Sequence, residues 1–158
     1  MRLFFCRQRP SANAFARSLK PTFGWLEHVE IDLTPRCDDG TLPPNSALLK
    51  WHSWLMEATE RAYKPLQYNH DTREVLAAQG FVNITEEVIK IPLNPWEKDS
   101  HQKDVGRWYN LGMTQGLEAC SLGPLTRISG WRAEDVVRLT NDVKKEICSR
   151  KIHVYHLA

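Results

Sequence analysis

Four side chains that can move protons or donate hydrogen bonds lie in two stretches with helical spacing. His52 lies within residues 47–63, and Tyr109, Gln115 and Glu118 lie within residues 101–121. An imidazole can act as an acid or a base near neutral pH, and a phenol or an amide can polarise a carbonyl by donating a hydrogen bond. We take these four residues as the candidate catalytic groups.

Large apolar side chains accompany these polar groups. Small-molecule pockets are mostly apolar with a few convergent polar groups, so we expect a pocket between the helices at 47–63 and 101–121. The residues expected to bind a substrate are Trp51, Leu55, Tyr68, His70, Trp96, Trp108, Gly112 and Met113. The alternative is that the aromatic side chains form core and the polar groups pair internally, for example Arg107 with Glu118 or a neighbouring carboxylate.

The elements that would position these residues follow from apolar periodicity. We expect helices over 11–19, 47–63, 71–79, 101–121 and 132–149, and strands over 24–33, 81–93 and 151–158. Apolar residues point in several directions around the helix at 101–121, which predicts burial on all sides. Asp38 and Asp39 follow the carboxyl end of the strand at 24–33, where open α/β sheets bind ligands.

The strand at 24–33 alternates in polarity. Trp25, Val29 and Ile31 share one face, whereas His28, Glu30 and Asp32 share the other. A face with three large apolar residues needs cover, so we expect it to meet the N-terminal segment or a second chain.

Composition excludes several classes of protein. The 158 residues are 42% hydrophobic and 25% charged, with a net charge of +2, which is ordinary for a globular domain. No basic stripe indicates nucleic acid binding, no apolar run is long enough to span a membrane, and no secretory signal is recognisable. The four cysteines lack metal-ligand spacing. We therefore expect a cytoplasmic protein with reduced thiols and no metal.

Several segments resemble one family when taken in order. They are "DDGTLPPNSALLKWHSWLMEATERA", "AAQGFVNITEEVIKIPLNPWEKD", "VGRWYNLGMTQGLEACSLGPLTRISGWRAEDV" and "RKIHVY". Together they resemble the fungal LaeA-like S-adenosylmethionine-dependent methyltransferases across residues 14–156. The resemblance implies that the chain corresponds to the C-terminal half of such a protein: its fifth strand, a helical substrate cap, and its sixth and seventh strands.

The implied fold is an α/β, truncated Rossmann-like methyltransferase fold in one domain, residues 1–158. Its late strands would be 24–33, 81–93 and 151–158, and its helical cap about 46–63 and 97–131. The cofactor site of such a fold needs a Gly-rich turn after the first strand and an acidic residue about twenty positions on. None of the eight glycines forms Gly-x-Gly-x-Gly, so we expect no cofactor.

Three functions are compatible with these features. We favour a methyltransferase-like protein of fungal secondary metabolism that binds an apolar small molecule and catalyses a cofactor-independent cyclisation or isomerisation. It would be an enzyme, but not a self-sufficient methyltransferase. The second is a non-catalytic or regulatory subunit of a full-length methyltransferase. The third is methyl transfer with the cofactor site completed by a partner chain.

The expected partners follow from the same reasoning. They are a small apolar substrate, a second copy of the chain in a homodimer, and a full-length methyltransferase, but neither nucleic acid nor a membrane. A strand edge without its family neighbour recruits another chain, which is the reason for expecting the homodimer.

Overall fold

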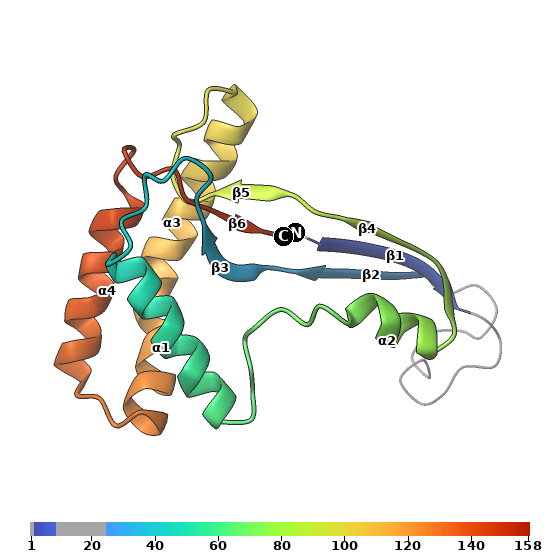
Figure 1. The fold of residues 1–158 in the computed structure, drawn as a ribbon, viewed down its shortest axis with the longest axis horizontal. Coiled ribbons are helices and arrows are strands. Elements are labelled where there is room, and N and C mark those ends of the chain that lie inside the picture. Colours follow the sequence, from blue (N-terminus) through green and yellow to red (C-terminus); the bar gives the residue numbers. More distant parts are fainter. Residues whose placement is uncertain (1, 9–24) are drawn as a thin grey trace. The chain divides into compact units, whose positions relative to one another are not determined.

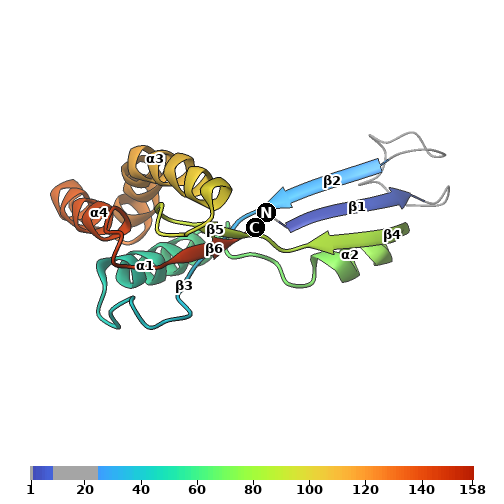
Figure 2. The same cartoon turned by 90° about the horizontal axis from the view of Figure 1, so that it is seen from above.

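Along the described chain, three strands are followed by two helices, two strands, three helical segments and one more strand, as Figures 1 and 2 show. This computed structural model describes residues 2–8, as backbone, and residues 25–158. The helix predicted at 11–19 lies outside these ranges. The described chain forms two units, which we treat separately. The first holds residues 2–8, 25–32, 68–90 and 157–158, and the second holds 33–67 and 91–156. The expectation of a mixed α/β protein is confirmed.

The first unit is built on a three-stranded antiparallel sheet. Its strand order is β2 (Trp25–Glu30), β1 (Arg2–Gln8) and β4 (Phe81–Glu87), so the strand from the N-terminal segment is central. Helix α2 (Thr72–Ala78) precedes β4. Leu76 of α2 and Phe81 of β4 are both buried and pack together, with Leu26 and Ile84 against them.

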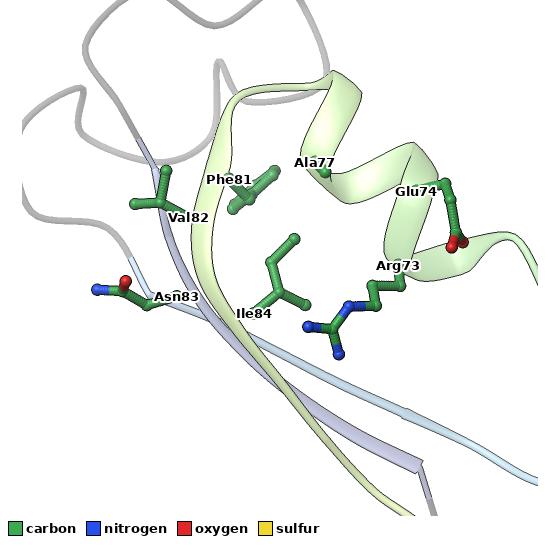
Figure 3. A pocket seen from close by; sticks show the side chains of 7 residues that line it. All are labelled: Arg73, Glu74, Ala77, Phe81, Val82, Asn83 and Ile84. Atoms are coloured by element: carbon green, nitrogen blue, oxygen red, sulfur yellow. The ribbon is translucent and has the colours of Figure 1, made fainter.

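Strand β4 contains an irregularity at Asn83. This residue has a φ of 56°, a left-handed conformation that Asn tolerates better than most residues. The register between β1 and β4 shifts near it. In Figure 3, Phe81 and Ile84 both point towards α2 while Asn83 points away. Residues three apart lie on opposite faces of a regular strand, so the irregularity is what brings both apolar side chains under the helix.

The alternation predicted for residues 24–33 is confirmed, but its apolar side is the exposed side. Trp25, Val29 and Ile31 are 62%, 45% and 37% exposed, whereas Leu26, His28 and Glu30 are half-buried. The reason is that Leu26 is the residue that packs against the core beneath α2. The side that the sequence suggested would need cover is therefore uncovered in the described structure.

The predicted strands are also divided. The stretch 24–33 forms β2 and β3 (Asp32–Arg36), which belong to different sheets, and 81–93 forms β4 and β5 (Lys90–Pro92). The closing strand is only β6 (Tyr155–Leu157). The neighbour of β2, which the resemblance implied to be missing, is β1 of this same chain. Pairing partners decide where strands end, and a run of β-forming residues does not reveal them.

The second unit packs four helical segments around an apolar core. They are α1 (Ala47–Arg61), α3 (Ser100–Leu122), the π-helical turn η2 (Gly123–Ile128) and α4 (Ala133–Ile147). Helix α1 packs on α4 and η2, and α3 also packs on α4 and η2. Leu48, Trp51 and Leu55 of α1 are buried at helical spacing. The turn η2 was not predicted, because Gly123-Pro124 suggested a break.

A side chain from α4 completes the start of α1. Glu146 accepts hydrogen bonds from the Ala47 and Leu48 N–H groups at 2.8 and 2.9 Å. Ser46 is the N-cap residue and accepts from Leu49 N–H through Oγ at 3.1 Å. The first N–H groups of a helix have no partner within the helix, so these contacts satisfy three of them and attach α4 to the N-terminus of α1.

The second sheet has the strand order β3, β6, β5. Strands β5 and β6 run antiparallel, with Leu93 opposite Val154 and Ile89 opposite Ala158. Asn94, which follows β5 and is 1% exposed, donates from its amide to the carbonyls of Ser149 and Ile152. The chain before β6 is thereby fixed to the chain after β5.

Two positions of α3 fix this helix against the core. Asn110 donates to the carbonyls of Leu93 and Ile147 at 2.7 and 2.8 Å. One turn earlier, Gly106 lies so close to the backbone of Asn94 that a Cβ atom placed there would be 2.6 Å from the Asn94 carbonyl oxygen. Only a residue without a side chain allows this approach.

We therefore expect Gly106→Ala to destabilise the protein by about 1–3 kcal/mol, because the helix or the Asn94 backbone must move. Gly116→Ala in the same helix is the control. A Cβ there meets nothing within 4 Å, so replacing this glycine should stabilise the helix by up to about 1 kcal/mol. Denaturant unfolding followed by helical circular dichroism measures both. Equal stability of the two variants would contradict the close approach.

Candidate functional site

A polar cluster lies at the carboxyl end of β3. We call it the β3 loop cluster, and its members are Cys37, Asp38, Asp39, Thr41, His153 and Tyr155. Asp39 is its centre: Oδ1 accepts from Thr41 N–H and hydroxyl at 3.1 and 2.8 Å and from the Cys37 thiol at 3.2 Å. Its other oxygen, Oδ2, lies 2.5 Å from His153 Nδ1.

These contacts orient the His153 imidazole. A carboxylate only accepts hydrogen bonds, so Nδ1 carries the proton and donates it to Asp39. Trp96 stacks on the ring, with centroids 4.8 Å apart and planes 25° apart, and the His153 N–H donates to Thr41 Oγ1 at 2.8 Å. An imidazole held in this way can accept or donate a proton at Nε2.

The charge state of Asp39 reflects the same contacts. The hydrogen bond from His153, followed by those from Thr41 and Cys37, holds the pKa of the Asp39 carboxyl well below its ordinary value of 3.8. Stabilisation of the charged form by hydrogen bonds lowers a carboxyl pKa in this way. Asp39 is therefore a carboxylate throughout the physiological range.

Strand β6 directs polar side chains to both faces of its sheet. The Tyr155 hydroxyl donates to Asp38 Oδ1 at 2.7 Å. His153 and Tyr155 therefore both make hydrogen bonds within the β3 loop cluster. On the opposite face His156, with no exposed surface, has Nδ1 2.7 Å from the Tyr109 hydroxyl of α3. Burial raises the pKa of the Tyr109 phenol above its usual value of 10.0, so Tyr109 is a neutral hydrogen-bonding group.

An open groove lies beside the first half of α3. It has a volume of about 520 Å³, and its lining residues are Ile91, His101, Asp104, Val105, Trp108 and Tyr109. Trp108 is 73% exposed. Arg107, also exposed, pairs with Asp104 at 2.5 Å, so its partner is a neighbouring carboxylate and not Glu118.

The predicted pocket between α1 and α3 is filled by core side chains. Trp51 is 2% exposed and donates through Nε1 to Ser121 Oγ at 2.8 Å. Leu55 has no exposed surface, and Met113 and Tyr109 pack against the same cluster. Among the described residues, Trp51 thus belongs to the core, whereas Trp108 is exposed and lines a groove to which Trp51 does not contribute.

The other predicted site residues are dispersed. Trp108, Gly112 and Gln115 are exposed on α3, and Glu118 and His52 are half-buried on α3 and α1. Tyr68 and His70 form an edge-to-face pair at 5.0 Å in the first unit. The prediction that α3 is buried on all sides is wrong, since one side is exposed. The catalytic and substrate-binding roles of all these residues stay predictions.

Sequence reasoning missed His153, Tyr155 and His156. The signal that could have identified them is the alternation in "HVYH" of the closing strand, which places two side chains on each face. Of the cluster, the sequence indicated only Asp38 and Asp39, from their position after the strand.

The first unit also carries a hollow, of about 350 Å³, between α2 and β4. Arg73, Glu74 and Ala77 of α2 line it together with residues 81–84, as Figure 3 shows. Among residues 2–8 and 25–158, no group of His, Cys, Asp or Glu could hold a metal ion. No helix in those ranges has the length and apolar character needed to cross a membrane.

Comparison with known proteins identifies relatives with a shared name. The chain is 56% identical over 139 residues to the secondary metabolism regulator LAE1 of Cochliobolus heterostrophus, covering 87% of this chain and 45% of that protein. It is 43% identical over 134 residues to the secondary metabolism regulator laeA of Monascus pilosus, covering 84% and 36%. It is 40% identical over 134 residues to the protein-methionine methyltransferase laeA of Emericella nidulans, covering 84% and 36%.

The chain thus spans less than half the length of each of these relatives. This coverage is consistent with the expected correspondence to the C-terminal part of such proteins. No family model and no solved structure matches the chain.

The β3 loop cluster predicts a specific dependence of stability on pH. Because folding lowers the pKa of Asp39, its carboxylate stabilises the fold above pH 3.8, and this contribution is lost as the pH falls towards the folded-state pKa. We expect Asp39→Asn to lower the melting temperature at about pH 6, with the difference from the unsubstituted protein shrinking below about pH 4.

Asp71→Asn is the control, since the Asp71 side chain makes no capping hydrogen bond to α2. Its melting temperature should follow that of the unsubstituted protein at every pH. A difference between Asp39→Asn and the unsubstituted protein that grows on acidification would contradict the role of the carboxylate.

Proposed function

Because this chain is a member of the LaeA-like group by sequence over most of its length, we propose that it acts in the regulation of fungal secondary metabolism, as the part of a methyltransferase-like regulator that does not hold the cofactor. The observation that carries the proposal is the 56% identity over 139 residues to a secondary metabolism regulator. Identity at this level over 87% of the chain implies the same local structure and favours the same role.

The fold is compatible with the end of a Rossmann-like methyltransferase domain. The resemblance assigns three late strands to this chain, and parts of all three meet in one sheet as β3, β6 and β5. Helices α1 and α3 belong to the stretches expected to form the cap. These features support the truncated methyltransferase fold.

The groove beside α3 favours a regulatory role over cyclisation. A cyclase that works by shape must enclose its substrate and hold the reacting ends together. Trp51 and its neighbours, expected to line an enclosed site, are instead packed in the core, and the groove beside α3 is open. The hydroxyl of Tyr109 is also engaged with His156. Cofactor-independent cyclisation thus has no support here.

Methyl transfer remains a second candidate, with the cofactor site completed outside this sequence. The Emericella nidulans relative is named a protein-methionine methyltransferase. For this chain the candidate requires a Gly-rich cofactor turn from elsewhere, since none of its own glycines supplies one. The homodimer expected from the sequence likewise stays a proposal.

The regulatory function can be tested with a chimera. In a Cochliobolus heterostrophus strain without LAE1, we would express LAE1 in which this chain replaces the matched 139 residues. We expect secondary metabolism transcripts to return to the level given by intact LAE1. LAE1 lacking those residues is the negative control. A chimera as abundant as LAE1 but no more active than that control would contradict the proposal.

Cofactor binding is tested separately on the chain by itself. We expect no heat of binding on titration with S-adenosylmethionine, because a helix N-terminus preceded by a Gly-rich turn is absent from its sequence. The chimera, titrated in the same way, is the matched comparison. Binding to the isolated chain in the micromolar range would show that it builds a cofactor site of another kind.

A further inference from the structure

Helix α3 has apolar residues on two opposite faces, whereas α4 has them on one. In α4, Val136, Thr140, Val143 and Ile147 are buried, and charged residues occupy the opposite side. In α3, Gly106, Leu117 and Ser121 are buried on the inner face. Trp108 and Leu111 nevertheless lie on the other side. A helix that is apolar on both sides is normally covered on both sides.

The second face is a continuous exposed strip. We call it the outer face of α3, and its residues, at helical spacing, are Trp108, Leu111, Gly112, Gln115 and Ala119. All five are exposed, Trp108 by 73% and Leu111 by 45%. The strip contains no charged residue, which is unusual for a helix surface facing water. At its N-terminal end Trp108 also borders the groove, whose wall includes Ile91 and Val105.

The glycines of α3 also indicate that another protein segment contacts this helix. Gly106 is needed for the close approach to Asn94, but Gly112 and Gly116 are not, since a Cβ at either position meets nothing within 4 Å. Glycine weakens a helix relative to alanine. Within the described chain no contact compensates for this at Gly112 or Gly116. A bare helix surface at these positions would allow another protein segment to approach the backbone closely.

We propose that the outer face of α3 is the docking surface for the part of a LaeA-like protein that lies outside the segment matched by this chain. The proposal rests on the proposed function, because it takes the relatives as the guide to the partner. The matched segment is only 45% of LAE1, so more than half of that protein is available to cover an apolar face here. The occupant would present an apolar surface with few charges, to match Trp108 and Leu111.

Two other occupants are distinguishable from this one. A second copy of the chain would cover the outer face in a concentration-dependent way. A small apolar molecule would have to bind in a groove that is open to solvent, which leaves much of its surface in water. A second copy gives a different result in the experiment below, whereas the open shape of the groove counts against the small molecule.

Hydroxyl-radical footprinting can measure the exposure of Trp108 in the isolated chain and in the LAE1 chimera described above. Two residues of the second unit set the scale: Trp51 is 2% exposed and Tyr63 is 94% exposed. We expect Trp108 to react rapidly in the isolated chain at low and high concentration, and to react as slowly as Trp51 in the chimera. Tyr63 should react rapidly in the isolated chain.

Three results would overturn the proposal. Trp108 that stays reactive in the chimera shows that the rest of LAE1 does not cover the outer face. Trp108 that becomes protected in the concentrated isolated chain identifies a second copy as the occupant. If the chimera does not fold, the chain is co-expressed with LAE1 that lacks the matched residues. The proposal then requires that the two proteins co-purify and that Trp108 is protected in the complex. Failure of either result counts against it.

A pair of substitutions separates docking from folding. Leu111 on the outer face and Leu66 elsewhere in the second unit are both 45% exposed. We expect Leu111→Ala to lower the melting temperature of the chimera by more than that of the isolated chain, and Leu66→Ala to lower both by the same amount. Equal behaviour of the two variants contradicts docking at α3. Because melting and footprinting do not depend on transcription, either proposal can fail without the other.

Discussion

The position of α3 depends on one amide side chain. Asn110 donates both hydrogens, to the carbonyls of Leu93 and Ile147, and so joins the end of β5, the last turn of α4 and the middle of α3. Each such bond contributes about 1 kcal/mol, and a buried carbonyl that loses its donor costs roughly 1–3 kcal/mol. The carbonyl of Ile147 belongs to the last turn of α4, where no helical partner exists. A single residue of α3 thereby satisfies two backbone carbonyls, one after β5 and one at the end of α4.

The consequences of this placement reach the candidate site. Gly106 allows α3 to approach Asn94, and Asn94 in turn holds the segment that leads into β6. With that segment fixed, His153, just before β6, contacts Asp39, and His156 of β6 contacts Tyr109. The β3 loop cluster and the Tyr109–His156 pair are thus positioned by the same backbone. The inner face of α3 makes these contacts, whereas the outer face stays uncovered in the described part of the chain.

The helices were predictable because their signals are local. The periods of apolar residues identified α1, α2, α3 and α4 to within three residues at each end. The ends of the strands were not predictable, because they depend on pairing partners far away in sequence. No pattern in the sequence indicated that β1 is a strand, and residues 24–36 pair in two different sheets. Exposure was inverted for Trp25 and Val29, since a strand's alternation shows two faces without showing which one is covered.

Only some residues of the site were predictable, because its members lie far apart in the sequence. Asp39 was visible from its place after a strand, but its partner His153 lies 114 positions away. Trp51, which we expected in a pocket, lies in the core. Its indole N–H donates a hydrogen bond to Ser121 there, so its polar group can be buried. Periodicity correctly showed that α3 is apolar on both sides. What it could not show is that the described part of this chain covers only one of those sides.

Hydrogen exchange of the isolated chain tests most directly whether the inner face alone fixes α3. If it does, the amides of α1, α3 and α4 exchange slowly and with the same opening free energy, and Asn110→Leu reduces their protection together. If α3 instead depends on a partner for its structure, its amides exchange at the rate of an unprotected peptide while α1 and α4 remain protected. That result would contradict a self-standing core with a free outer face.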